Sequence, residues 1–114
     1  MSQKLLIRAD LVHDFHRLGV PRGGLLMVHS SLSSIGHVNG GAETVVDALL
    51  EVLGPEGTLV VPTFTDEAAV EDPSFIFDPL NTPSLVGAIS EAVRRRPRTR
   101  RSLHGWHSVA AMGP

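Results

Sequence analysis

The sequence has no cysteine among its 114 residues. A chain without thiols has no disulfide framework, no thiolate metal site and no cysteine nucleophile, and we expect no metal centre. Long apolar runs are also absent: none approaches the roughly 20 residues that span a bilayer, and no signal-like apolar segment follows Met1-Ser2-Gln3-Lys4. We therefore expect a cytoplasmic chain that has no membrane contact and is stabilised by packing.

Basic residues are missing from the middle of the chain. No Lys or Arg lies between Arg22 and Arg94, a stretch that holds ten of the twelve acidic residues, and six arginines then follow within residues 94–101. This division suits a protein that meets both a cation and a polyanion. We expect small-molecule partners and no nucleic acid. Solvated helix faces and loops are the simpler interpretation of most of the acids.

Helix-like and strand-like patterns alternate along the chain, which predicts an α/β fold over residues 1–114, as one domain or as part of one. We expect helices over residues 9–18, 42–53 and 82–96, and strands over residues 25–28, 58–61 and 108–112. The strands over 25–28 and 58–61 are continuously apolar, which is typical of parallel strands buried on both faces. Between Thr63 and Asn81 we expect a long acidic loop, of a length that is often functional.

A serine-rich segment follows the first strand directly. Residues 29–36 read His-Ser-Ser-Leu-Ser-Ser-Ile-Gly, and Gly40-Gly41 opens the next helix. Open α/β sheets bind ligands beyond the carboxyl ends of their strands, so the hydroxyls and loop amides are positioned to hold a phosphate or carbonyl oxygen. The segment lacks the Gly-Lys-Ser/Thr ending of a P-loop. Turns of this composition are also common in purely structural roles.

The tail from Arg100 to Ala111 combines guanidinium groups, hydroxyls, two histidines and an indole. Arginine forks match phosphate oxygens. Arg101 leads into a Ser/His cluster and is the best phosphate ligand by this reasoning. The arginines before it are interpreted as the solvated C-terminal end of a helix, where positive charge is favourable: Arg94, Arg95, Arg96 and Arg98.

Five segments in order resemble the aminoglycoside 3-N-acetyltransferases. They are residues 28–36 (VHSSLSSIG), 40–50 (GGAETVVDALL), 54–65 (GPEGTLVVPTFT), 82–84 (TPS) and 101–104 (RSLH). The resemblance implies a three-layer α/β/α fold with a largely parallel or mixed central sheet, present here only in part. It also implies transfer of acetyl from acetyl-CoA to the 3-amino group of a deoxystreptamine antibiotic, which is antibiotic resistance chemistry.

Carried over position by position, the resemblance places the coenzyme against two segments of this chain. The residues concerned are His29, Ser30, Ser31, Leu32, Ser33, Arg101, Ser102, His107, Ser108 and Val109. Asp66 and Glu67 are expected to hold the aminoglycoside, because carboxylates attract and steer a polycation. Where the family has Pro-Thr after the histidine that matches His104, this chain has Gly105-Trp106, which makes that turn more flexible.

The family's chains are more than twice as long, and the resemblance places the histidine and glutamate that deprotonate the acceptor ammonium beyond Pro114. We therefore expect the 114-residue chain to be inactive alone and to self-associate through an exposed sheet face. Two alternatives stay open at this point. One is a non-catalytic module that binds coenzyme A or a nucleotide, and the other is an acetyltransferase-family domain that acts on a different amine.

Overall fold

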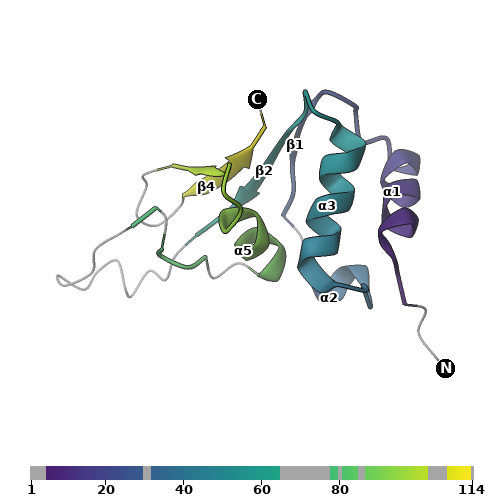
Figure 1. Ribbon diagram of the computed structural model, residues 1–114, viewed down its shortest axis with the longest axis horizontal. Coiled ribbons are helices and arrows are strands. Elements are labelled where there is room, and N and C mark those ends of the chain that lie inside the picture. Colours follow the sequence, from purple (N-terminus) through teal and green to yellow (C-terminus); the bar gives the residue numbers. More distant parts are fainter. Residues whose placement is uncertain are drawn as a thin grey trace.

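The computed structural model describes residues 5–29, 32–64, 78–79, 81–84, 87–102 and 108–113. Its helices and strands are interspersed along the chain, as the sequence pattern predicts (Figure 1). They are, in chain order, α1 (Arg8–Arg17), β1 (Leu25–Met27), α2 (Leu32–Ile35), α3 (Gly41–Leu53), β2 (Thr58–Pro62), α5 (Ala88–Arg94), β3 (Arg100–Arg101) and β4 (Val109–Met112).

The two longer helices follow from their apolar spacing and their ends. Along α3 the buried side chains recur every three to four residues, and this row forms one face of the helix. The helix ends at Gly54, whose φ of 75° is a conformation that glycine adopts without strain. Helix α1 begins where the Asp10 carboxylate accepts a hydrogen bond of 3.0 Å from the Ile7 amide. These two predicted helices are confirmed within one residue at each end.

The strands form one mixed sheet in the order β1-β2-β4-β3. β1 and β2 run parallel, with Leu26 opposite Leu59, and α3 is the crossover between them. β4 runs antiparallel to β2, with Pro62 opposite Val109, and the two-residue β3 pairs with β4 at the far edge. The predicted α/β class and the mixed sheet are therefore confirmed, whereas β3 was not predicted because two arginines carry no strand signal.

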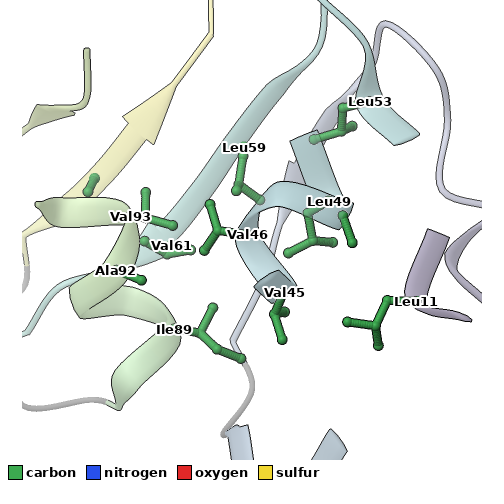
Figure 2. Close-up of a cluster of buried hydrophobic side chains, with 12 residues drawn as sticks. Leu11, Val45, Val46, Leu49, Leu53, Leu59, Val61, Ile89, Ala92 and Val93 are labelled. Carbon is green, nitrogen blue, oxygen red and sulfur yellow. The ribbon is translucent and has the colours of Figure 1, made fainter. Parts of the chain in front are cut away.

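One face of the sheet carries the core. α3 and α5 lie over this face, and α1 packs on the outer side of α3 (Figure 1). Leu59 and Val61 point from β2 toward side chains of both helices, and Leu11 joins them from α1 (Figure 2). The core residues are Leu11, Val45, Val46, Ala48, Leu49, Leu53, Leu59, Val61, Ile89, Ala92, Val93 and Ala110. Burial of these side chains holds the strands in place, and with them the strand ends at which the candidate functional site lies.

The opposite face of the sheet is open over β1. Leu25 and Met27, whose neighbours in register are Thr58 and Val60, are 71% and 59% exposed. The prediction that the first strand is buried on both faces is therefore wrong, because β1 is an edge strand and no helix of the described chain covers this side of it.

The predicted helix over residues 82–96 is also wrong at its start. α5 begins at Ala88 after Gly87, which has a φ of 113°. Thr82 does not cap the helix, because its hydroxyl accepts a hydrogen bond of 2.8 Å from the Asp78 amide. Thr82, Pro83 and Ser84 are non-helical, so the segment across residues 82–84 belongs to the loop that approaches the site.

Candidate functional site

The ends of three strands lie along one border of the sheet, which we call the carboxyl edge because β1 and β2 end there; the outer strands β1 and β3 form the two other edges. β1 and β2 end there and β4 begins there, since the Val28 amide donates to the Val60 carbonyl and the Thr63 amide donates to the Ser108 carbonyl. His29, exposed just after β1, lies at this same edge. The short helix α2 (Leu32–Ile35) replaces part of the predicted serine loop. The edge therefore gathers segments far apart in the sequence, as the parallel β1-α3-β2 connection requires.

Two buried hydroxyls lie at the centre of this edge. Thr63 and Ser108 are both 0% exposed, and their hydroxyl oxygens are 2.9 Å apart. The Ser108 hydroxyl also donates to the Thr63 carbonyl at 2.8 Å. Buried hydroxyls are costly when unpaired, so these two side chains hold one another in place. Their hydrogen bond fixes Ser108, which precedes β4, relative to Thr63, which follows β2.

The Arg101 guanidinium holds three segments together. Its Nε donates to the Thr63 and Ser108 hydroxyls at 3.1 and 3.0 Å, and its Nη2 donates to the Thr63 carbonyl at 2.8 Å. Nη1 donates to the Thr82 carbonyl. Burial and the nearby charge of Arg94 lower the pKa of Arg101 below its usual range. Arginine nevertheless stays protonated, so a fixed positive charge lies beside the hydroxyl pair.

Glu91 links this centre to α5. Its carboxylate accepts hydrogen bonds from the Arg94 guanidinium at 2.6 and 2.8 Å and from the Ser84 amide. Burial alone would raise the pKa of Glu91, but the bonds from Arg94 and Ser84, together with the charges of Arg94 and Arg101, lower it below the ordinary value of 4.5. Glu91 is therefore ionised at neutral pH and fixes the loop that carries Thr82.

The structure brings together several of the residues predicted for the coenzyme. His29 lies at the carboxyl edge, Leu32 opens α2, and Ser102 and Val109 are joined by two hydrogen bonds of 2.9 Å. Arg101 and Ser108 are in contact, as described above. Ser33 lies within α2. The remaining predicted residues lie outside the described residues: Ser30, Ser31, His107, Asp66 and Glu67.

Three contributors were not singled out as site residues from the sequence. Thr63 and Thr82 are hydrogen-bonded to Arg101 across 38 and 19 residues, separations that no local pattern predicts. Glu91 is hydrogen-bonded to Arg94 three residues along α5, and its charge also acts on Arg101. The arginine interpretation also needs correction. Arg95 and Arg98 are exposed as expected, but Arg94 pairs with Glu91, and Arg96 pairs with Glu43 and Asp47 at 2.7 and 2.9 Å.

The described residues carry neither a membrane-spanning helix nor a cluster of metal ligands. No helix there is both long enough and apolar enough to cross a bilayer. Likewise, the described part of the chain holds no group of three or more His, Asp or Glu side chains arranged to bind a metal ion.

A family model and several relatives match the chain. The model described as aminoglycoside 3-N-acetyltransferase matches residues 27–114. Aminoglycoside N(3)-acetyltransferase VIII of Streptomyces fradiae is 35% identical and covers 94% of this chain, and aminoglycoside N(3)-acetyltransferase IV of a Salmonella species is 37% identical over 94%. This chain covers 43% and 40% of those two proteins, so it spans less than half of their length.

Solved structures agree with the relatives. Aminoglycoside acetyltransferase AAC(3)-IVa as an apoenzyme matches all of this chain with a TM-score of 0.89 and 34% identity, and 43% of that chain is covered. The binary complex of AAC-IIIb with CoASH matches 97% of this chain with a TM-score of 0.84 and 28% identity, and 47% of that chain is covered. With the family model matching most of its residues, this chain belongs to the aminoglycoside 3-N-acetyltransferase family.

Proposed function

We propose that this chain supplies the acetyl-CoA side of an aminoglycoside 3-N-acetyltransferase. The observation that carries the proposal is the convergence of His29, Arg101, Ser102 and Ser108 at the carboxyl edge of the sheet, in a member of this family. A relative's structure in complex with CoASH supports a coenzyme A cosubstrate. A variant of AAC(3)-IVa in complex with a gentamicin supports an aminoglycoside acceptor.

The reaction defines what the edge has to do. The acceptor nitrogen forms a bond to the thioester carbonyl carbon, the carbon–sulfur bond breaks, and the coenzyme thiolate leaves and takes up a proton. The acceptor arrives as an ammonium and must first lose a proton to a base. We propose that Ser30, Ser31, Ser33, His107 and Val109 complete the coenzyme contacts, and that Asp66 and Glu67 attract the cationic acceptor.

The hydroxyl pair has a positioning role in this proposal. Ser108 and Thr63 are fully buried and hydrogen-bonded to one another, so they are not free to reach a ligand with both hydroxyls. They instead fix the backbone on either side of the edge, while the exposed His29 and Ser102 are open to the coenzyme. A site held by buried neighbours loses little entropy when it binds its ligand.

Catalysis is expected to need more than these residues. The base that deprotonates the acceptor is proposed to be a histidine with a glutamate partner, supplied by the part of the relatives that this chain does not match, because this chain covers less than half of their length. The 114-residue chain alone is then expected to bind coenzyme A without turnover. Location in the cytoplasm, where acetyl-CoA is available, belongs to the same proposal.

The test separates binding from turnover. Calorimetric titration with coenzyme A should detect binding, and His29→Ala should weaken it by about threefold to tenfold, whereas His16→Ala on α1 should not; both side chains are exposed, so both variants should fold. Equal affinities for the two variants would contradict the assignment of His29. Thiol release with acetyl-CoA and gentamicin should be absent, and turnover abolished by His29→Ala or His107→Ala would place the base within this chain.

Self-association is the second proposed property. The apolar side chains Leu25 and Met27 are mostly exposed on the open face of β1, and large apolar side chains exposed together mark surfaces where chains associate. We propose that two copies associate through this face of β1. Sedimentation velocity at increasing protein concentration should show a growing dimer, and a monomer at all concentrations would contradict the proposal.

A further inference from the structure

A cavity lined by arginines lies away from the exposed β1 face, between the end of α5, β3 and the loop at Pro79. It encloses about 630 Å³, a volume in the range of small-molecule sites. Among the residues that the structure describes, nine line the cavity; five of these are arginines and none is acidic. The lining consists of Pro79, Asn81, Arg94, Arg95, Arg96, Pro97, Thr99, Arg100 and Arg101.

The backbone that carries these arginines is held in place. The Thr99 hydroxyl donates to the Val93 carbonyl at 2.6 Å, and the Thr99 amide donates to the Arg96 carbonyl at 3.1 Å. The Arg96 amide in turn donates to the Val93 carbonyl at 3.1 Å. Residues 94–99 are therefore a closed turn between α5 and β3 rather than a frayed helix end, which fixes the backbone positions from which the arginine side chains extend.

The positive charge of the lining is only partly compensated. Arg94 is paired with Glu91, and Arg96 with Glu43 and Asp47. Arg95 and Arg100 are exposed, and neither forms an ion pair with any residue that the structure describes. Burial lowers the pKa of Arg101, and the nearby positive charge of Arg94 lowers it further.

Arg96 is a partly buried member of the cavity lining. Its side chain is 18% exposed and lines the cavity, yet its Nε is buried and has no hydrogen-bond partner among the described atoms. Buried donors in folded proteins are nearly always paired, and an unpaired one costs about 1–3 kcal/mol. An anion entering the cavity would offset the excess of positive charge in its lining.

We propose that the arginine-lined cavity binds a phosphate or pyrophosphate group. Guanidinium forks donate paired hydrogen bonds to phosphate oxygens, and Arg95 and Arg100 have their donors available for such an anion. The group is carried either by a free phosphorylated anion or by coenzyme A, whose phosphates have the same chemistry. Arg101 is shared with the proposed acetyl-CoA side, but Arg95 and Arg100, on which the test relies, are not among the residues proposed for acetyl transfer.

Titration of the 114-residue chain with inorganic pyrophosphate, followed by calorimetry, tests the site. Arg95→Gln and Arg100→Gln should each weaken binding about tenfold, and the double variant should abolish it, while Arg17→Gln on α1 should leave it unchanged. All three side chains are exposed, so circular dichroism should show native folds. Affinity should also fall between about 50 mM and about 200 mM salt.

The source of the phosphate is decided by competition. If coenzyme A displaces pyrophosphate from the wild-type chain and dephospho-coenzyme A displaces less of it, the coenzyme's 3′-phosphate occupies the site. If neither displaces it, a free phosphorylated anion is the ligand, and both results support the site. Absence of pyrophosphate binding, or binding that Arg95→Gln and Arg100→Gln weaken no more than Arg17→Gln does, would overturn the proposal whatever the outcome of the acetyltransfer assay.

Discussion

Replacing Arg101 by alanine should destabilise the fold, because its guanidinium joins the ends of β2, the Thr82 loop and the start of β4. The substitution removes donors to the Thr63 hydroxyl and carbonyl, the Ser108 hydroxyl and the Thr82 carbonyl. A hydrogen bond to a charged group contributes about 1.5–3 kcal/mol, but bonds that share one residue do not add.

The hydroxyl pair limits the loss. Thr63 and Ser108 keep their mutual contact of 2.9 Å, and Ser108 keeps its bond of 2.8 Å to the Thr63 carbonyl, so the removal of Arg101 does not leave them unpaired. The Thr82 carbonyl loses its donor from Arg101. We therefore expect a decrease of about 2–4 kcal/mol in the free energy of unfolding, a large part of the 5–15 kcal/mol typical of small domains.

Urea denaturation followed by far-ultraviolet circular dichroism measures this decrease. Arg95→Ala is the matched control, since that side chain is exposed and should change stability by less than about 0.5 kcal/mol. Arg101→Lys keeps the charge but loses the fork, so it should recover only a minor part of the stability. Equal unfolding midpoints for Arg101→Ala and Arg95→Ala would refute the reasoning.

Three further changes test other parts of the structure. Leu53→Ala should lower the free energy of unfolding by about 2–5 kcal/mol in the same urea assay, since Leu53 is fully buried in the core, and a loss below about 1 kcal/mol would contradict its packing. Folding lowers the pKa of Glu91, so the contribution of this carboxylate to the free energy of unfolding is present above pH 4.5 and is lost as the pH falls through the lower folded pKa. The stability difference between wild type and Glu91→Gln should therefore shrink on acidification, and a difference that stays constant with pH would exclude this linkage. Met27→Lys should leave the unfolding midpoint nearly unchanged but reduce dimer formation in sedimentation, because Met27 is 59% exposed on β1, and an unaltered dimer would show that this face is not the interface.

The predictable part of the fold is the part decided by local spacing. The apolar row from Val45 to Leu53 and the glycine at 54 predict α3 to within one residue, because the helical period and the C-terminal glycine act over a few residues. The burial of β1 was not predictable in the same way. A strand reads as apolar whether it lies at the centre or the edge of a sheet, and its place depends on which elements pack beside it.

The candidate site, too, has a part that could be predicted from the sequence and a part that could not. That His29 and Thr63 lie at one edge follows from the rule for carboxyl ends of parallel strands, whereas the place of Ser108, before the antiparallel β4, was expected only from the likeness to the family. The contacts of Arg101 with Thr63 and Thr82 were not accessible, since they cross 38 and 19 residues and involve carbonyl oxygens that every residue possesses. Nor does a run of arginines reveal which members pair with Glu43, Asp47 or Glu91.

The two edges of the sheet differ in chemistry. β1 presents Leu25 and Met27, whereas β3 at the opposite edge consists of Arg100 and Arg101. Charged residues on a short edge strand oppose pairing with another strand, and an apolar edge permits it. The sheet is therefore extensible in one direction: an added strand, whether from this polypeptide, a second copy or a designed peptide, should pair beside β1, and a peptide that blocks that edge should cap the sheet while leaving the arginine-bearing side unoccupied.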